Sequence, residues 1–515
     1  MKVTKFSALA ALMLMAPVAQ QAFALPPTTA LNSTNDVVIN LSGSSALQPV
    51  IGQFVTSVCN PGTGPADRLD VYLDGTAGAS WRSYSCNLKA SVITANGLPP
   101  NAKMLLNNRN KGGSVWGVIP VNAGDPVAYM NINPTNGGGC VEISPAGALP
   151  GTWNCPVVIP ATTNFVAGEC APGAVFAPGN VVCQRSTAGI SDVEPKMFIA
   201  PNLPLGFTPP LDNYAKLTQF SENGVIFGIL VTENLYRELQ IAQKVPGVTP
   251  ISPMDWTPAS QPSMKKTEVA SILKGDLQNW LDVNKAWTST GATTGAMAVC
   301  RRTPGSGTQA GANAYFMENM CRTASLRPGS LSMVTSGFSF PGYQVVENSA
   351  TGNLLTCMNS AFTATNFGTA DFLGTSHDAI GFAGIDILGG NPVRPVHTGA
   401  TPDHFDFVKL DGVAPTVANA ISGDYTFWYE NTLQWPIAAS GFGPNANNLA
   451  MLNQLQQTAA NPATIVSAGL PGVAALPTPT RLWDTVGNFP TMRGTRNGNS
   501  CQDVILTKDN SISPP

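Results

Sequence analysis

The sequence predicts an α/β fold, and three kinds of pattern support this prediction. Residues 37–41 are β-branched and apolar, as strands usually are, and residues 224–231 form a continuous apolar run typical of a buried strand. Residues 267–274 have a helical pattern that Gly275 ends. Strands also run directly into turns rich in glycine and hydroxyl side chains. Because α/β sheets bind ligands beyond the carboxyl ends of their strands, we expect the functional site at these turns.

The chain is long enough for two or three folded domains. It has 515 residues, of which 43% are hydrophobic and 11% are charged, a composition typical of a folded protein with substantial cores. The formal net charge is −3, and no basic patch with interleaved aromatic residues is present. Nucleic acid is therefore not an expected partner.

The first 24 residues have the pattern of a secretory signal peptide. Two lysines precede an apolar stretch, residues 6–18, and Ala-Phe-Ala at 22–24 fits a cleavage site. We therefore expect the mature chain to begin near Leu25 and to reside in the periplasm or outside the cell. Because the first cysteine is Cys59, no lipidation cysteine follows the signal, and no later apolar run is long enough to predict a membrane span.

The ten cysteines predict disulfide bonds, because an even number in an exported chain points to an oxidising compartment. Their spacing suggests three local pairs: Cys59–Cys86, Cys140–Cys155 and Cys170–Cys183. The last four allow several pairings: Cys300, Cys321, Cys357 and Cys501. No Cys-x-x-Cys pair exists and the three histidines are far from a chelating spacing, so neither a metal nor another cofactor is expected.

Residues 87–185 differ in composition from the rest of the chain. Glycine, proline and asparagine are frequent there, four cysteines fall in the range, and the β-like runs are short. We interpret this range as an irregular, disulfide-rich β insertion into the α/β framework.

The most informative stretch is residues 300–316, where an arginine precedes a glycine-rich turn and the start of a helix. The first N–H groups of a helix lack intrahelical partners and carry partial positive charge, and glycine lets an anion approach them. Arg302 adds a permanently charged fork, while Ser306, Gly307 and Thr308 can supply hydroxyl and backbone donors. The alternative interpretation is an ordinary glycine-serine loop with a surface arginine.

Three further turns carry candidate ligands. Ser45 and Ala46 follow the first predicted strand, Thr76 follows the second, and Asp192 lies on a turn of its own. The alternative is that Ser45 only caps its helix and that Asp192 caps its turn and pairs with a nearby arginine such as Arg185.

These motifs stand in the same order as those of a known family. Gly-Ser-Ser-Ala at 43–46, Gly-Thr-Ala-Gly at 75–78, Ser-Asp at 191–192 and the Arg-x-x-Gly-Ser-Gly-Thr loop at 302–308 carry the resemblance. The helix and tryptophan at 269–280 and the closing stretches at 379–382 and 411–425 complete it. Over about 36–86 and 186–435 the chain resembles the phosphate-binding proteins of bacterial ABC phosphate transporters, a branch of the type 2 periplasmic binding proteins.

The resemblance implies two α/β lobes joined by crossing strands, with an anion held between them. It assigns residues 25–221 and 396–515 to the first lobe, which also contains the insertion, and residues 222–395 to the second. The implied ligand of this monomer is inorganic phosphate or a related oxyanion, and an ABC transporter permease is a further partner that the resemblance allows. The implied ligand residues are Ser45, Ala46, Thr76, Asp192, Arg302, Ser306, Gly307 and Thr308.

Asp192 is the residue from which we predict selectivity. An ionised carboxylate only accepts hydrogen bonds, so a protonated phosphate can satisfy it, whereas fully ionised sulfate would be repelled.

Two features depart from the family pattern. The family's threonine and phenylalanine in the first loop are replaced by Ser45 and Ala46, and the insertion and the tail from about residue 436 have no counterpart. A secreted phosphatase-like enzyme and an extracellular interaction protein are the competing hypotheses. No Gly-x-Ser-x-Gly, Gly-x-x-x-x-Gly-Lys-Ser/Thr or His-Glu-x-x-His motif is present, so we favour binding without catalysis.

Overall fold

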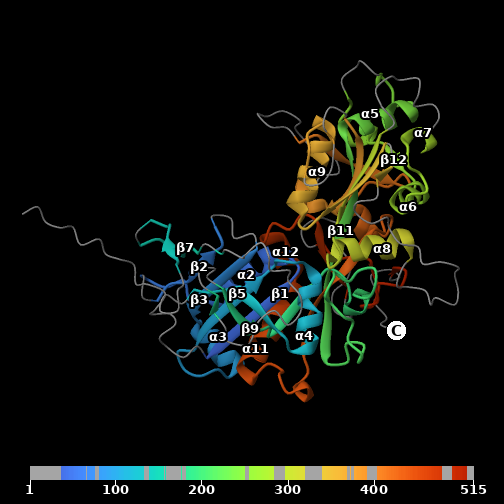
Figure 1. The fold of residues 1–515 in the computed structure, drawn as a ribbon. Coiled ribbons are helices and arrows are strands. Elements are labelled where there is room, and N and C mark those ends of the chain that lie inside the picture. The colour runs from blue at the N-terminus through green and yellow to red at the C-terminus, as the bar shows by residue number, and fades with distance from the viewer. Residues whose placement is uncertain are drawn as a thin grey trace, which may run out of the picture.

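The chain forms two lobes, which Figure 1 shows one above the other. The computed structural model describes residues 36–64, 67–75, 80–132, 139–145, 147–155, 157, 175–176, 181–249, 254–283, 296–318, 339–340, 342–367, 372, 376–390, 403–477 and 490–506. The predicted signal peptide and the candidate ligand Thr76 lie outside these residues.

The first lobe is built on a sheet in which β1 (Val37–Gly43) lies between two parallel neighbours. The strand order is β18-β10-β1-β4-β3-β2-β7-β6. The other strands are β2 (Asp70–Leu73), β3 (Trp81–Asn87), β4 (Lys103–Arg109), β6 (Val141–Glu142), β7 (Gly151–Asn154), β10 (Ala188–Ser191) and β18 (Trp428–Pro436).

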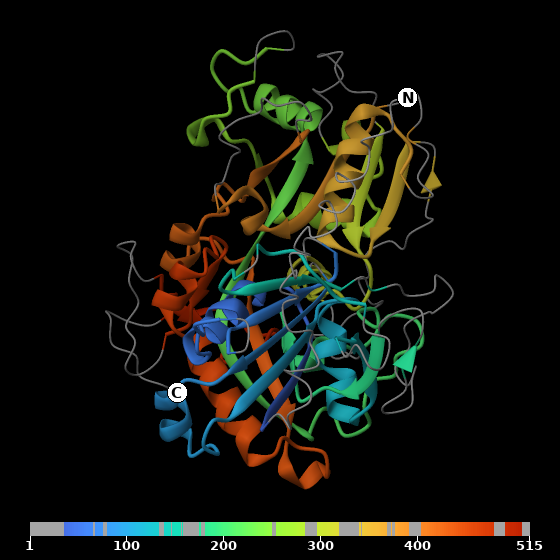
Figure 2. The same ribbon diagram turned by 90° about the vertical axis from the view of Figure 1, so that its left-hand side faces the viewer.

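Helices cover this sheet and complete the first lobe's core. They are α2 (Gln48–Val58), α3 (Ala90–Asn96), α4 (Ile119–Ala123), α11 (Ala446–Ala459) and α12 (Pro462–Ser467). Helix α11 packs against α2 although the two are far apart in the chain (Figure 2). Ile39, Phe54 and Leu452 are fully buried where the strands and these helices meet. The C-terminal segment adds β19 (Val473–Ala475), β20 (Gly494–Thr495) and β21 (Ile505–Leu506).

The predicted insertion is only partly irregular. Its first strand, β4, is a central strand of the first lobe's sheet, because it pairs with β1 on one side and with β3 on the other. A separate three-stranded sheet follows, in the order β5-β9-β8. Its strands are β5 (Pro126–Met130), β8 (Val175–Phe176) and β9 (Val181–Arg185).

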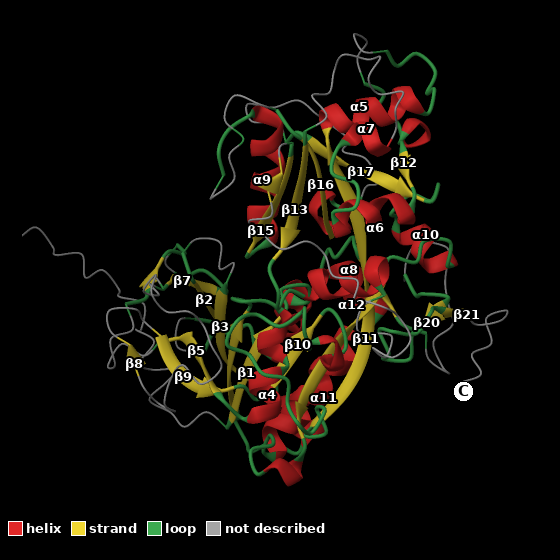
Figure 3. Cartoon of the chain, turned by 45° about the vertical axis from the view of Figure 1, so that its right-hand side comes forward, coloured by secondary structure: helices red, strands yellow, loops and turns green. Residues whose placement is uncertain are grey.

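The second lobe has its own group of strands, in the order β14-β15-β13-β16-β11, with β17 and β12 alongside. These are β11 (Leu217–Thr232), β12 (Ser263–Met264), β13 (Met297–Arg302), β14 (Ser339–Phe340), β15 (Tyr343–Asn348), β16 (Asp378–Gly384) and β17 (Phe405–Leu410). The helices are α5 (Glu233–Ala242), α6 (Lys266–Lys274), α7 (Trp280–Val283), α8 (Gly307–Met317), α9 (Thr351–Thr363) and α10 (Val417–Ser422). Helices α9 and α6 lie on opposite sides of the strands (Figure 3).

Strand β11 belongs to both lobes and joins them. Its first part, up to Ile226, pairs with β18, and its last part, from Phe227, pairs with β16 and β17. A single 16-stranded sheet therefore runs through the whole molecule. Because β17 pairs with β11 and β12, it belongs to the second lobe, and the chain returns to the first lobe with β18. The resemblance had assigned all residues from 396 onward to the first lobe.

Local sequence signals explain where the elements begin and end. The predicted buried strand at 224–231 is part of β11, and the predicted helix at 267–274 is α6. Gly275 ends α6 with a φ of 83°, a conformation that glycine adopts without a steric penalty. None of the described helices is both long and apolar enough to cross a membrane.

Disulfide bonds staple each lobe. The predicted Cys59–Cys86 and Cys140–Cys155 pairs are confirmed. A third bond joins Cys300 in β13 to Cys357 in α9, which is one of the pairings that the sequence left open. The predicted Cys170–Cys183 pair remains a prediction, because Cys170 lies outside the described residues, although Cys183 is disulfide-bonded. None of the described cysteines is free.

Candidate functional site

The candidate site lies where turns from the two lobes meet. The first lobe contributes the turn after β1, a short 3-10 helix at Ser114–Gly117 and the turn after β10. The second lobe contributes the turn between β13 and α8. Two backbone hydrogen bonds fix the contact: the Val115 N–H donates to the Gly305 carbonyl at 3.0 Å, and the Gly305 N–H donates to the Asn202 carbonyl at 2.8 Å.

Asp192 is at the centre of this contact and is only 8% exposed. The Ser44 hydroxyl donates to its Oδ1 atom, and the Ser114 hydroxyl donates to Oδ2 at 3.3 Å. The amide of Asn431, from β18, lies 3.5 Å from Oδ1. Burial raises the pKa of Asp192, against the opposing effects of the Ser44 hydrogen bond and of the positive charge of Arg302.

The N-terminus of α8 faces the Asp192 carboxylate from the second lobe. Gly305 has a φ of 91°, which allows the sharp turn that aims the helix. Ser306 caps the helix, since its Oγ accepts from the Gln309 N–H at 3.4 Å. At Gly307 an added Cβ atom would lie 2.8 Å from Asp192 Oδ2, so only glycine allows the helix to come this close. The partial positive charge of the helix start therefore acts on a carboxylate here.

Arg302, the last residue of β13, provides the positive charge at the site. Its guanidinium donates from Nε to the Asn348 carbonyl at 3.2 Å, from Nη1 to Thr351 Oγ1 at 2.9 Å and from Nη2 to the Ser349 carbonyl at 3.1 Å. All three acceptors are neutral. In the described part of the chain no carboxylate lies within 4.0 Å of this guanidinium.

The charge state of Arg302 follows from this setting. Burial lowers the pKa of Arg302 to about 10, and the negative charge of Asp192 acts in the opposite direction. The side chain is therefore still charged at neutral pH. Because a guanidinium has five N–H donors and only three are used, Arg302 can donate two more hydrogen bonds.

The eight predicted ligand residues fall into three groups in the structure. Asp192 and Gly307 are in direct contact, and Arg302 acts on Asp192 through its charge. Ser306 and Thr308 are buried beside them at the start of α8, where the Ser306 hydroxyl is engaged as a helix cap. The third group does not join the cluster with its side chains or cannot be placed: Ser45, Ala46 and Thr76.

In the first loop, the contact to Asp192 comes from Ser44 and not from Ser45. Ser44 is 4% exposed, and its Oγ also accepts from the Ala46 N–H at 3.0 Å. Ser45 is exposed, and its carbonyl accepts from the N–H of Gln48, the first residue of α2, at 3.0 Å. The serine next to the predicted one therefore faces the site.

Two other residues of the cluster were not predicted from the sequence. Ser114 follows Gly112 and Gly113, both with positive φ, in the range interpreted as the insertion. The two glycines before Ser114 were the sequence pattern that could have indicated a tight turn carrying a ligand residue. Asn431 belongs to a polar run in the fully buried strand β18, and such a run between tryptophans points to partners inside the protein.

The donor set fits an anion better than a metal ion. The Ser44 and Ser114 hydroxyls and the Asn431 amide donate to the Asp192 carboxylate, and the positive charge of Arg302 acts on it. Within the described residues, no three side chains of His, Cys, Asp or Glu gather in a way that could hold a metal.

Comparisons with known proteins give matches at the level of structure alone. No family model matches the sequence, and no curated protein matches it. One similar structure is a Clostridium perfringens protein solved with bound phosphate and provisionally assigned as a phosphate ABC transporter substrate-binding protein. It has 11% identity and a TM-score of 0.34, over 81% of this chain and 92% of that chain.

Two further similar structures come from other bacteria. The first is an ABC-type phosphate transport receptor from Vibrio cholerae, with 12% identity and a TM-score of 0.32, over 81% of this chain and 93% of that chain. The second is PstS from Borrelia burgdorferi, with 11% identity and a TM-score of 0.29, over 79% and 90%. These TM-scores are too low for the likeness to support a function.

Proposed function

We propose that this protein binds an inorganic oxyanion, phosphate in the first place, between its two lobes and releases it unchanged. The observation that carries the proposal is Arg302. It is a charged, partly buried guanidinium with two spare N–H donors and no carboxylate partner among the described residues. Such a group is costly to bury unless an anion compensates it.

Asp192 makes phosphate the preferred ligand among the oxyanions. Its carboxylate can accept a hydrogen bond but cannot donate one while it is ionised. Phosphate at neutral pH carries at least one proton and can donate to Asp192, whereas sulfate carries none. The hydroxyls of Ser44 and Ser114 each donate their one proton to the carboxylate and hold it in place.

The two-lobed architecture supplies a way in for the ligand. Arg302 and the α8 N-terminus belong to the second lobe, while Asp192, Ser44 and Ser114 belong to the first. Gly307 and Asp192 are in contact, so the lobes meet closely at this point. An anion would enter when the lobes separate, and its contacts to both would favour the closed arrangement.

Binding without turnover is also part of the proposal. A Ser–Asp pair with no histidine between its members lacks the base that activates a serine nucleophile. Among the described histidines, His404 pairs with Glu233 at 3.2 Å in the second lobe, away from Asp192. We further propose export to the periplasm or beyond, in agreement with the disulfides, and delivery of the anion to a transporter.

Calorimetric titration of the ligand-stripped mature protein with phosphate, arsenate and sulfate tests the proposal. Phosphate should bind more tightly than sulfate. Arg302→Gln should weaken phosphate binding by about 1.5–3 kcal/mol or more, which corresponds to at least about tenfold in affinity. Arg302→Lys should recover part of this loss, because it restores the charge but not the fork.

Arg185→Gln is the matched control, since it removes the same charge from an exposed position of the first lobe. If the Arg302 and Arg185 variants lost equal phosphate affinity, the loss would come from the change in net charge alone, which would contradict the proposed site. Incubation with a chromogenic phosphate ester tests turnover separately. Hydrolysis that Ser44→Ala abolishes would favour the phosphatase-like alternative.

A further inference from the structure

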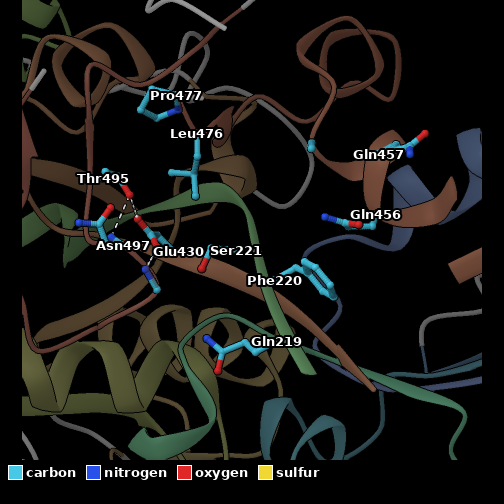
Figure 4. Close-up of a pocket in the computed structure, with 12 residues that line it drawn as sticks. Gln219, Phe220, Ser221, Glu430, Gln456, Gln457, Leu476, Pro477, Thr495 and Asn497 are labelled. Carbon is cyan, nitrogen blue, oxygen red and sulfur yellow. Dashed lines mark hydrogen bonds between the residues drawn. The ribbon is translucent and has the colours of Figure 1, made fainter. Parts of the chain in front are cut away.

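The first lobe contains a cavity that the proposed function does not use. Its volume is about 650 Å³, within the usual range for pockets that hold small organic molecules. Strand β11, helix α11 and the C-terminal segment 490–506 form its walls (Figure 4). The main lining side chains are Gln219, Phe220, Ser221, Gln456, Gln457 and Asn497.

This cavity and Asp192 are contacted by neighbouring residues of β18. Glu430 and Asn431 are consecutive residues of β18, and successive side chains of a strand point to opposite faces. Glu430 points to the cavity and the C-terminal segment, while Asn431 points to Asp192. None of the side chains printed in contact with Asp192 in the described residues lines the cavity, so the two sites can be tested independently.

The polar groups of the lining are mostly amides that the protein itself leaves available. In the described residues, the side chains of Gln219, Gln456, Gln457 and Asn497 have no hydrogen-bond partner, and neither does Ser221 Oγ. An amide side chain can donate two hydrogen bonds and can also accept them, and a hydroxyl can likewise donate and accept. The lining therefore suits ligand groups that donate and accept at the same time.

Glu430 is the only charged side chain that lines the cavity in the described part of the chain, and its carboxylate already accepts several hydrogen bonds from the protein. Its carboxylate accepts from Thr495 Oγ1 at 2.6 Å and from the Gly498 N–H at 2.6 Å, as well as from the Arg496 N–H. No lysine or arginine is among the described lining residues. An anion would be repelled here, and a cation would find a carboxylate that is already engaged.

We propose that this cavity is a binding site for a neutral saccharide. Sugar hydroxyls donate and accept, which matches the four amides, and one of them can donate to Glu430. Phe220 offers an apolar ring surface, and the ring is steadied by Trp435 at a centroid distance of 4.8 Å. An aromatic surface next to hydrogen-bonding groups fits a sugar ring, whose faces are apolar and whose edge is polar.

Saturation-transfer NMR and calorimetry with maltotriose and chitotriose, as neutral probes, test the site. A trimer of galacturonic acid is the charged comparison. At least one neutral trisaccharide should bind to the wild-type protein, and the acidic one should not. The double variant Gln219→Ala/Gln456→Ala should weaken this binding by about tenfold or more. Asn497→Gly removes the amide at an exposed position where φ is 52°, a conformation that glycine adopts without strain, and should also weaken the binding.

Asn453→Ala is the matched control, because Asn453 is an exposed amide of α11 that does not line the cavity. It should leave saccharide binding unchanged, as should Arg302→Gln, which acts on the inter-lobe site alone. Failure of both neutral trisaccharides to bind would overturn the proposal. So would equal binding of the acidic trimer, or binding that the Gln219, Gln456 and Asn497 variants leave intact.

Discussion

Gly307 of the second lobe touches Asp192 of the first, and a Cβ atom on Gly307 would lie 2.7 Å from Asp192 Cβ. Neither side of this contact can give way easily. Asp192 is held by Ser44 and Ser114, and Gly307 is fixed by the helix that it begins. The lobes therefore meet through a contact that tolerates no additional atom, which makes it a direct point of control over closure.

Gly307→Ala should hold the lobes apart. Overpacking of a tight contact costs about 1–3 kcal/mol, and here the cost can be avoided by opening the hinge. Small-angle scattering should show a larger radius of gyration for this variant than for wild type, and phosphate binding should weaken. Gly52→Ala in α2 is the control, because an added Cβ there meets nothing within 4 Å. An unchanged radius for Gly307→Ala would show that this contact does not govern closure.

Ser44→Ala should weaken phosphate binding, while Ser45→Ala should have little effect. Loss of the Ser44 hydroxyl leaves the buried Asp192 carboxylate short of one donor, at a cost of about 1–3 kcal/mol. Ser45 is exposed and uses only its backbone carbonyl locally. Titration of both variants with phosphate makes the comparison. If Ser45→Ala weakened phosphate binding more than Ser44→Ala, Ser45 would be the ligand residue of this loop, as predicted from the sequence.

Asp192→Asn should reduce the discrimination between phosphate and sulfate by about 1.5–3 kcal/mol, because the new amide can donate to a fully ionised anion. Calorimetric titration of the variant and of the wild-type protein with phosphate and with sulfate measures this discrimination. Unchanged discrimination would remove Asp192 from the binding site.

The pH dependence of stability gives a second test of Asp192. Burial raises its pKa in the folded state, so the folded chain binds this proton more tightly than the unfolded chain does. The contribution of Asp192 to the free energy of unfolding is then largest at low pH and falls as the pH rises through the raised pKa. The melting temperature of ligand-free Asp192→Asn should exceed that of wild type near neutral pH, and the gap should close on acidification. A gap independent of pH would contradict a raised pKa.

The Cys300–Cys357 bond should support the arginine that the site depends on. It ties β13, which ends at Arg302, to α9, whose Thr351 accepts from the Arg302 guanidinium. It closes a loop of 57 residues, so its removal should cost about 4 kcal/mol. Cys300→Ala/Cys357→Ala should lower both thermal stability and phosphate affinity. Cys140→Ala/Cys155→Ala, in the first lobe, should spare the affinity, and equal losses in both variants would contradict this link.

Much of the fold could be predicted because it follows from local patterns. The apolar run at 224–231, the glycine stop after α6 and the even cysteine count each reflect a constraint that acts within a few residues of the chain. The lobe boundary was harder to place, because the strand at 405–410 is assigned by its pairing with β11, and pairing between distant segments leaves no mark in a short window.

The candidate site was predictable in type but not in every residue. The turn at Arg302 and Gly307 has its own signature, since glycine and arginine there serve chemistry that few other residues allow. Whether Ser44 or Ser45 faces the site depends on how the chain leaves β1, because one step along the backbone turns a side chain to the other face. Ser114 and Asn431 join the site only through the tertiary fold.

The arrangement of the first lobe determines when it can fold. Strand β1 begins the described chain, yet its Val38 N–H donates to Asn448, 410 residues later, and Glu194 is bonded to Ser500 across 306 residues. A ribosome makes the chain from its N-terminus, so the strand partners of β1, which are β4 and β10, are made well before the α11 residue Asn448. Contacts this distant in sequence make folding slow, and they leave the early strands without the cover of α11 until that helix has been made. The newly made chain therefore remains unfinished, and open to a chaperone or a translocation channel, for most of its synthesis.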